Sequence, residues 1–399
     1  MDIAMKKLCY FINSDWYFDL HWIDRAIAAR DAGYEIHIIS HFVDGKVLNK
    51  FKTFGFKCHN VPLDAQSFNA LTFFRAFFAS RKLIKEINPD LLHCITIKPC
   101  LIGGLLSRTN NRPVIVSFVG LGRVFSGDTG LLKLLRNITI MAYKYIASNK
   151  RSIFMFEHDK DRKKLAGFVG IDYQQTIVID GAGINPEIYK YSLEQERDVP
   201  VVLFASRMLW SKGLGDLIEA KKILEARNIH FTLNVAGILV ENDKDAISLA
   251  VIQQWHKEGL INWLGHSSNV CDLIEESNIV ALPSIYSEGV PRILLEASSV
   301  GRACIAYDVG GCDSLIINND NGIIVKSNSP QELADKLEFL LANPKARVEM
   351  GIKGRQRVQD KFSREGANKR GNSSRLTQSF HFFMFEPIFS PVNALNQPI

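Results

Sequence analysis

The alternation of short apolar runs with helical segments constrains the fold of this 399-residue chain more than any other feature. In the second half, runs rich in aliphatic and β-branched residues recur at intervals that leave room for a helix between them. These runs are VVLFAS (201–206), HFTLNVAG (230–237), INWLG (261–265), IVALPS (279–284), ACIAYD (303–308) and GIIVK (322–326). Stretches with helical spacing, such as 213–227 and 243–258, lie between them. Strands this continuously apolar are buried on both faces, which predicts a parallel sheet with helices on both sides.

The first half repeats this alternation less regularly. Strands are expected at 6–13, 34–40, 90–97, 113–120, 152–157 and 176–183, and helices at 20–32, 68–87, 99–108 and 131–147. The chain is too long for one ordinary hydrophobic core, and the polar stretch SLEQERDV (192–199) is the best candidate for a linker. The sequence therefore predicts an α/β protein of two Rossmann-like, doubly wound domains with an intervening cleft, at 1–190 and 191–365.

The last segment, 366–399, does not continue this pattern. It contains the aromatic cluster FHFFMF and shows no helical spacing. We interpret it as an atypical tail, either a divergent segment that touches a membrane or the product of an altered reading frame.

Charge and cysteine content restrict the class of protein. The net charge of +6 fits an anionic ligand or an acidic surface, and is too small to indicate nucleic acid. The seven cysteines are odd in number and form no CxxC pair, which favours reduced thiols in a cytoplasmic protein. Cys304 and Cys312 lack the further ligands of a zinc site, so no metal is expected. Neither a signal peptide nor a transmembrane run of about 18 apolar residues is recognisable.

Two cations follow the first strand of the second half. In doubly wound sheets, ligands bind beyond the carboxyl ends of the strands. At that end of the 201–206 strand lies RMLWSKG, which places Arg207 and Lys212 directly before a helix that opens near Gly213. Cations beside a helix N-terminus suit a diphosphate group, although a solvated basic loop is the alternative.

Two glutamates flank the start of a later helix, in SEGVPRILLEASSVG (287–301). Pro291 fits the first helical position, where its missing N–H costs nothing, and Gly301 should end the helix. Glu288 then precedes the helix while Glu296 lies on its second turn, with backbone N–H groups of 289–292 between them. One carboxylate can bind sugar hydroxyls, the helix start a phosphate and the other carboxylate a ribose. The alternatives are a loop charge and an exposed helical glutamate.

These residues carry a resemblance to a known family. The E-x7-E pair, with RMLWSKG upstream and AYDVGGCDSLI downstream, resembles the retaining glycosyltransferases of the GT-B fold, and more narrowly glycosyltransferase family 4. FINSDWYFDLH, LLHCITIKP, SFVGLGRVFSG and DGAGINPEIY are similar to its bacterial branch, and the likeness covers residues 6–365. That branch adds a sugar, often an N-acetylhexosamine from a UDP donor, to lipid-linked precursors of capsule, O-antigen or glycoprotein glycans.

The resemblance implies a role for each matching position. Arg207 and Lys212 would hold the donor diphosphate and offset the charge on the leaving nucleotide, which makes them catalytic together with Glu288 at the donor sugar. Glu296 would bind the ribose. No Asp-x-Asp motif is present, so no metal and no cofactor are implied beyond the nucleotide-sugar substrate. The expected substrate-binding residues are Glu296, Gly289, Val290, Pro291, Arg292, His93, Lys98 and Gly183.

The chain departs from the family in two loops of the first half. The Gly-Gly loop of many members is replaced by INSDWYF, which leaves the local donor or acceptor contact open. Some members carry a histidine in the loop that here follows residue 97, whereas this chain has His93 inside the strand run. His93 is therefore either a core residue or a residue at the edge of the cleft.

The stretches 67–87 and 131–151 combine apolar residues with Lys and Arg. Basic amphipathic helices of this kind either lie on an anionic membrane or simply cover the sheet. The expected partners are thus a nucleotide-sugar donor, a lipid-linked saccharide acceptor and the inner face of the cell membrane, with no nucleic acid. Two other functions remain open, a sugar-nucleotide epimerase of the same architecture and a non-catalytic protein that binds a nucleotide sugar.

Overall fold

The computed structural model describes residues 5–362, except for 44, 64–68, 128, 180–183, 185, 241–242, 268 and 287–288. The chain divides into two compact units, Met1–Ile179 and Asp180–Ser373. The division therefore falls between residues 179 and 180, whereas the sequence analysis placed it between 190 and 191. The atypical tail expected at 366–399 lies outside the described residues.

The N-terminal unit is built on one sheet of parallel strands in the order β3-β2-β1-β4-β5-β6-β7. The strands are β1 (Lys7–Ile12), β2 (Glu35–Ser40), β3 (Lys57–Asn60), β4 (Leu91–Ile95), β5 (Val114–Phe118), β6 (Ser152–Phe156) and β7 (Thr176–Val178). Side chains alternate between the two faces of a strand, so Leu8 and Tyr10 of β1 join one core while Cys9 and Phe11 join the other. Both faces are therefore covered, as the sequence predicted.

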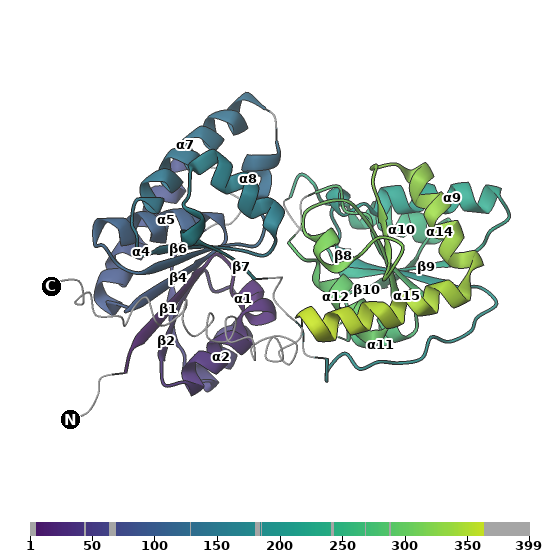
Figure 1. Cartoon of the computed structure of the whole chain (residues 1–399), viewed down its shortest axis with the longest axis horizontal. Coiled ribbons are helices and arrows are strands. Elements are labelled where there is room, and N and C mark those ends of the chain that lie inside the picture. Colours follow the sequence, from purple (N-terminus) through teal and green to yellow (C-terminus); the bar gives the residue numbers. More distant parts are fainter. Residues whose placement is uncertain are drawn as a thin grey trace, which may run out of the picture. The chain divides into compact units, whose positions relative to one another are not determined.

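Helices form a layer on each face of this sheet (Figure 1). One layer contains α1 (Asp15–His21), α2 (Ile23–Asp31) and α3 (Gly45–Thr53). The other contains α4 (Ala70–Ile87), α5 (Ile97–Thr109), α6 (Gly122–Ser126), α7 (Gly130–Ala147) and α8 (Asp159–Val169). The helix expected over 20–32 corresponds to α2, and the preceding helix α1, which meets α2 at Trp22, was not predicted.

The sequence analysis missed several elements here, among them α3, β3 and α8. The edge strand β3 reads KCHN and pairs with β2 alone, so it needs no continuous apolar run. The helix α8 reads DKDRKKLAGFV and buries Asp161 together with only three apolar residues, Leu165, Ala166 and Val169, which weakens its periodic signal.

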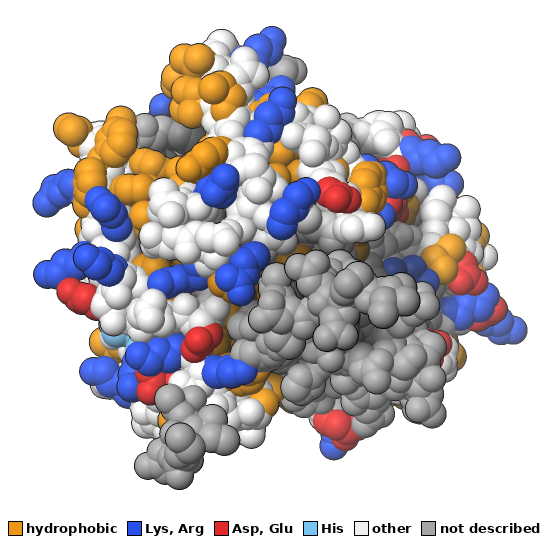
Figure 2. Space-filling model, turned by 60° about the vertical axis from the view of Figure 1, so that its left-hand side comes forward, with side chains coloured by type: hydrophobic (Ala, Val, Ile, Leu, Met, Phe, Trp, Pro, Cys, Tyr) orange, Lys and Arg blue, Asp and Glu red, His pale blue; other side chains and the backbone are white. Residues whose placement is uncertain are grey.

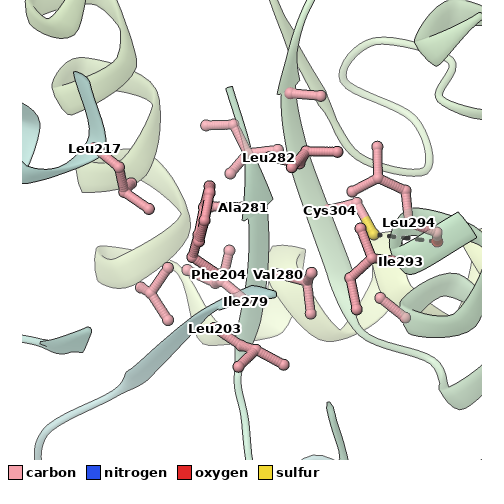
Figure 3. Close-up of a cluster of buried hydrophobic side chains, with 14 of the residues drawn as sticks. Leu203, Phe204, Leu217, Ile279, Val280, Ala281, Leu282, Ile293, Leu294 and Cys304 are labelled. Atoms are coloured by element: carbon pink, nitrogen blue, oxygen red, sulfur yellow. Dashed lines mark hydrogen bonds between the residues drawn. The ribbon is translucent and has the colours of Figure 1, made fainter. Parts of the chain in front are cut away.

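The C-terminal unit repeats the architecture with the strand order β10-β9-β8-β11-β12-β13, again parallel throughout. Its strands are β8 (Val201–Arg207), β9 (Thr232–Ile238), β10 (Asn262–Gly265), β11 (Ile279–Leu282), β12 (Ala303–Tyr307) and β13 (Ile323–Val325). Its helices are α9 (Leu214–Ala226), α10 (Leu249–Lys257), α11 (Val270–Glu275), α12 (Arg292–Val300), α13 (Cys312–Leu315), α14 (Pro330–Ala342) and α15 (Pro344–Arg357). Figure 3 shows the apolar side chains of β8 and β11 packed against those of α9 and α12.

The chain reverses its direction of winding at β8. This strand lies between β9 on one side and β11 on the other, so the connections leaving β8 and β11 run to opposite sides of the sheet. Such a switch point opens a crevice at the carboxyl ends of the two central strands, and ligands of doubly wound proteins bind there. The loops that follow β8 and β11 are therefore the first place to look for a site.

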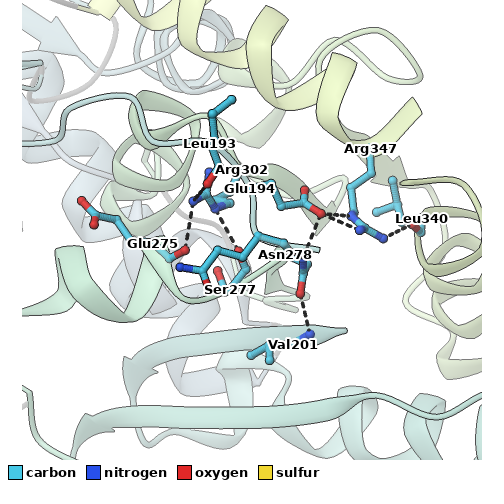
Figure 4. Close-up of polar contacts among 10 residues, drawn as sticks. Leu193, Glu194, Val201, Glu275, Ser277, Asn278, Arg302, Leu340 and Arg347 are labelled. Carbon is cyan, nitrogen blue, oxygen red and sulfur yellow. Dashed lines mark hydrogen bonds and ion pairs between the residues drawn. The ribbon is translucent and has the colours of Figure 1, made fainter. Parts of the chain in front are cut away.

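The stretch 192–199, predicted to be a linker, is instead anchored to the C-terminal unit (Figure 4). The carboxylate of Glu194 accepts hydrogen bonds from Arg347 Nε at 2.9 Å and Asn278 Nδ2 at 2.8 Å, and both charged side chains are about 5% exposed. Arg302 donates to the backbone carbonyls of Ser192 at 2.7 Å and Glu275 at 2.9 Å. The prediction was wrong because polar composition alone does not show that a charge is buried with a partner.

Candidate active site

The loops after β8 and β11 touch each other directly. The backbone N–H of Ile285 and the hydroxyl of Ser284 both donate to the carbonyl oxygen of Ser211, at 2.9 Å and 3.0 Å. Gly213 packs so closely that a Cβ atom there would lie 1.8 Å from the carbonyl oxygen of Pro283, and its φ is +83°. Only glycine fits that position, which explains the KG pair that follows the cations in the sequence.

Arg207 lies at the carboxyl end of β8, and Lys212 lies in the loop that follows it. Arg207 is the exposed last residue of the strand, and Lys212 ends a short 3-10 turn, Trp210–Lys212, at the entrance to α9. Asp245 holds this turn in place, because its carboxylate accepts hydrogen bonds from the backbone N–H and the hydroxyl of Ser211. Among the described residues, no side chain caps the N-terminus of α9. Two cations and a helix N-terminus are thus positioned on one anchored loop, an arrangement that favours an anion.

The helix α12 follows the loop after β11 and ends where the sequence predicted, at Gly301 in the left-handed conformation. Its start differs by one residue, since Pro291 has ψ of 125° and is the N-cap rather than the first helical residue. Gly289, Val290 and Pro291 are buried. Glu288 and Gly183, both predicted site residues, lie outside the described residues.

Glu296 is buried, with only 6% of its surface exposed, so the alternative of an exposed helical glutamate is wrong. Its oxygen Oε1 accepts two hydrogen bonds, from the hydroxyl of Tyr189 at 2.7 Å and from Arg292 Nε at 2.7 Å. No described residue bonds to the second oxygen, Oε2. Burial and the Glu296 carboxylate raise the pKa of Tyr189, and the same carboxylate raises the pKa of Arg292 against the opposing effect of burial. The carboxylate is therefore held through one oxygen and has the other oxygen left for a ligand.

Tyr189 is the site residue that sequence analysis missed. Its backbone carbonyl accepts from the hydroxyl of Ser299 at 2.7 Å and from Arg355 Nη1 at 3.1 Å, so both its main chain and its hydroxyl are attached to the α12 region. Tyr189 lies 107 positions before Glu296 in the chain. No local spacing could have connected the two.

His93 lies in the core of the N-terminal unit. It is fully buried in β4, its Nε2 is 2.7 Å from the hydroxyl of Ser117, and its ring packs against those of Tyr10 and Trp22. Burial, together with the smaller effect of the positive charge of Arg25, lowers the pKa of His93 to about 3. This placement favours the core alternative over a substrate contact.

Lys98 is the second residue of α5, half-buried at the carboxyl end of β4. It follows Thr96, which adopts a φ of +72° that is uncommon for a residue other than glycine. Lys98 therefore lies in the N-terminal unit, apart in the chain from the β8 and β11 loops.

Comparison with known proteins identifies the group to which the chain belongs. The family described as "Glycosyl transferase 4-like" matches residues 7–155, and the family described as "Glycosyl transferases group 1" matches residues 187–357. The chain is a family 4-like glycosyltransferase. Its N-terminal and C-terminal units each correspond to one of these two matches.

Similar proteins act in bacterial glycan assembly. The transferase is 24% identical over 336 residues to an N,N'-diacetylbacillosaminyl-diphospho-undecaprenol alpha-1,3-N-acetylgalactosaminyltransferase of Campylobacter jejuni, a match that covers 81% of this chain and 86% of the relative. It is 23% identical over 356 residues to the capsular polysaccharide biosynthesis glycosyltransferase CapM of Staphylococcus aureus, covering 84% and 87% of the two chains.

Solved structures agree on the fold. A glycosyltransferase from Rickettsia africae matches with a TM-score of 0.73 and 18% identity, covering 97% of this chain and all of that one. HepE from Anabaena, solved in complex with UDP, matches with a TM-score of 0.71 and 17% identity over 92% and 99% of the two chains. The transferase therefore has the GT-B fold that the sequence predicted.

Proposed function

We propose that the transferase moves a hexose or N-acetylhexosamine from a nucleotide sugar, with UDP as the nucleotide, to an undecaprenyl-diphosphate-linked saccharide, and that the anomeric configuration is retained. One observation carries the proposal. The cation-bearing loop after β8 is hydrogen-bonded to the loop that leads from β11 into the helix of Glu296, at the switch point of the C-terminal sheet. The UDP bound to HepE and the undecaprenol named in the Campylobacter relative support the choice of donor and acceptor.

In this proposal each group acts on a different part of the donor. Arg207 and Lys212 bind the diphosphate and offset the negative charge that grows on it as the glycosidic bond breaks. Because two fixed cations supply this charge, we propose a reaction that needs no metal or cofactor. Glu296 accepts the ribose hydroxyls through Oε2, and Glu288 contacts the donor sugar. The backbone of Gly289 and Val290 supports the phosphate.

The acceptor determines where the protein works. A polyprenyl-linked saccharide stays at the bilayer, so we place the transferase in the cytoplasm at the inner face of the cell membrane. Its role is then in the biosynthesis of capsule, lipopolysaccharide or a related surface glycan.

The test is to incubate the protein with a panel of nucleotide sugars, with and without a polyprenyl-diphosphate acceptor extract. Release of nucleoside diphosphate only when the acceptor is present, with a matching glycolipid product, is the expected result. Conversion of the donor to another sugar nucleotide without acceptor would indicate an epimerase. Tight binding of one donor with no conversion under any condition would indicate a non-catalytic binding protein.

The two glutamates should differ in the kind of loss that they cause. Glu296→Gln should weaken binding of UDP itself, because the ribose is present in donor and product alike. Glu288→Gln should leave UDP affinity nearly unchanged and lower the transfer rate, because its contact matters as positive charge develops on the sugar. Calorimetry with UDP and turnover measurements separate the two, and normal values of both quantities in both variants would remove the pair from the site.

A further inference from the structure

The helix α7 exposes a stripe of large apolar side chains along its whole length. Leu131, Leu134, Ile138, Met141 and Tyr145 are between 48% and 69% exposed. At 100° per residue these positions fall within an arc of roughly 80°, and at 1.5 Å per residue they extend over about 21 Å. Single apolar residues are common on protein surfaces, but an ordered row of this length is a feature of interaction surfaces.

The opposite side of α7 packs against the core of the N-terminal unit. Thr139, Tyr143 and Ile146 are buried there, and Tyr143 and Ile146 belong to the core that lies against the sheet. Covering the sheet therefore explains the inner face of α7 and leaves the outer stripe unexplained.

Positive charge accompanies the stripe. Lys133 and Lys144 are exposed, and by helical geometry both lie along the same edge of the apolar row. The whole of Gly130–Ala147 contains no acidic residue. Arg136, by contrast, is engaged within the protein, where its Nε donates to the carbonyl oxygen of Val124 at 2.9 Å.

The neighbouring helix α4 presents a related face. Its first turns expose Leu71, Phe74 and Phe78, and its later turns expose Arg81 and Lys85. Glu86 is its single acidic residue. Since α5 packs against both α4 and α7, the two helices belong to one layer. Figure 2 shows hydrophobic side chains gathered toward the top and upper left of one face of the molecule, with Lys and Arg side chains beside them.

We propose that the outer faces of α4 and α7, here called the docking surface, bind an anionic lipid bilayer. Apolar side chains flanked by lysines and arginines match such a membrane in both respects, since the first enter the acyl boundary and the second attract the anionic headgroups. None of the helices in the described part of the chain is long and apolar enough to cross a bilayer, so the contact is peripheral. The inference extends the proposed function, because it brings the transferase to the surface that holds its acceptor.

Sedimentation of the full-length protein with lipid vesicles tests this inference. The protein should pellet with phosphatidylcholine vesicles that contain phosphatidylglycerol, and much less with phosphatidylcholine alone. Added salt should release it, because exposed charges are screened. Equal sedimentation with both vesicle types, or none with either at low salt, would overturn the proposal.

Two sets of substitutions locate the contact. Lys133→Glu with Lys144→Glu should weaken vesicle binding at least about 20-fold, since each basic residue near an anionic surface contributes about fivefold. Leu134→Ser, Ile138→Ser and Met141→Ser together should also abolish sedimentation. The matched control replaces Leu249 and Ile352, exposed apolar residues of the C-terminal unit, by Ser and should sediment like wild type.

UDP binding measured without vesicles separates this inference from the proposed function. All these variants should keep the UDP affinity of the wild type, because none lies in the donor site. Absence of UDP binding in the wild type would count against the donor site alone. If the serine variant sediments like wild type, the docking surface is refuted. It is also refuted if light scattering shows that the wild type is a dimer, that the serine substitutions dissociate this dimer, and that the dimer does not sediment with vesicles.

Discussion

Replacement of Tyr189 by Phe removes one of the hydrogen bonds to the Glu296 carboxylate, which we assign to the ribose. Glu296 Oε1 then keeps only the bond from Arg292, and this buried carboxylate oxygen loses one of its two described partners. A hydrogen bond to a charged group contributes about 1.5–3 kcal/mol. Since 1.4 kcal/mol corresponds to a factor of ten, Tyr189→Phe should weaken UDP binding by about 10- to 100-fold.

A second tyrosine in the same unit provides the matched control. The hydroxyl of buried Tyr307 donates to Asp216 Oδ2 at 3.0 Å, so Tyr307→Phe deletes a bond of the same type that the proposal does not assign to the nucleotide. Both variants should lower the free energy of unfolding by about 1–3 kcal/mol. Only Tyr189→Phe should change the dissociation constant of UDP.

Isothermal titration calorimetry with UDP and chemical denaturation of the same samples give the two quantities. If Tyr189→Phe loses stability but binds UDP like wild type, the bond from Tyr189 is purely structural. An equal loss of UDP affinity in Tyr307→Phe would show that general loosening of the unit, and not the orientation of Glu296, controls binding. Either result would refute the reasoning.

Three further predictions concern charged and titrating side chains. Arg207→Ala and Lys212→Ala should each lower turnover by about 100- to 1000-fold, while denaturation midpoints change little because neither residue is buried. His93 has a folded pKa of about 3, below its unfolded value near 6.5. The stability that comes from burying neutral His93 is therefore present above pH 6.5, and it is lost at lower pH because the unfolded chain then binds a proton that the folded chain does not. The free energy of unfolding should fall by about 2 kcal/mol between pH 7 and 5, and denaturation curves of His93→Gln should not show this loss. Arg347→Met leaves the buried Glu194 carboxylate without its ion pair and should cost about 3–5 kcal/mol of unfolding free energy. Arg227→Met, which removes exposed pairs with Asp335 and Glu338, should cost less than about 1 kcal/mol in the same assay.

The sequence predicted the parts of the fold that depend on local periodicity. The central strands β8, β11 and β12 of the C-terminal unit are largely apolar runs, so they were recognised within one or two residues of their observed ends. The edge strand β3 and the helix α8 were missed because an edge strand and a mostly exposed helix need few apolar positions. The sequence analysis predicted parallel sheets covered on both faces but no strand order, which came from the structure alone.

The site was predictable only in part, for a related reason. Arg207 and Lys212 follow a recognisable strand and precede a recognisable helix, so their place at the switch point could be expected. Tyr189 and the pairing of Glu194 with Arg347 join positions far apart in the chain, and no periodicity encodes such pairs. His93 shows a different limit, because a histidine near a family motif can equally be a buried core residue, and the sequence alone did not distinguish the two.

The two bonds on Glu296 Oε1 also have an entropic consequence. A free glutamate populates several rotamers, and fixing such a side chain on binding costs about 0.5–1.5 kcal/mol. Here Tyr189 and Arg292 fix the rotamer before any nucleotide arrives, and Oε2 already has one direction in which to accept a hydroxyl. Because the Glu296 side chain is rigid, its Oε2 cannot rotate toward water when the ligand lacks the ribose hydroxyl. The protein should therefore discriminate strongly between UDP and a deoxyribose analogue that lacks the hydroxyl bound by Glu296.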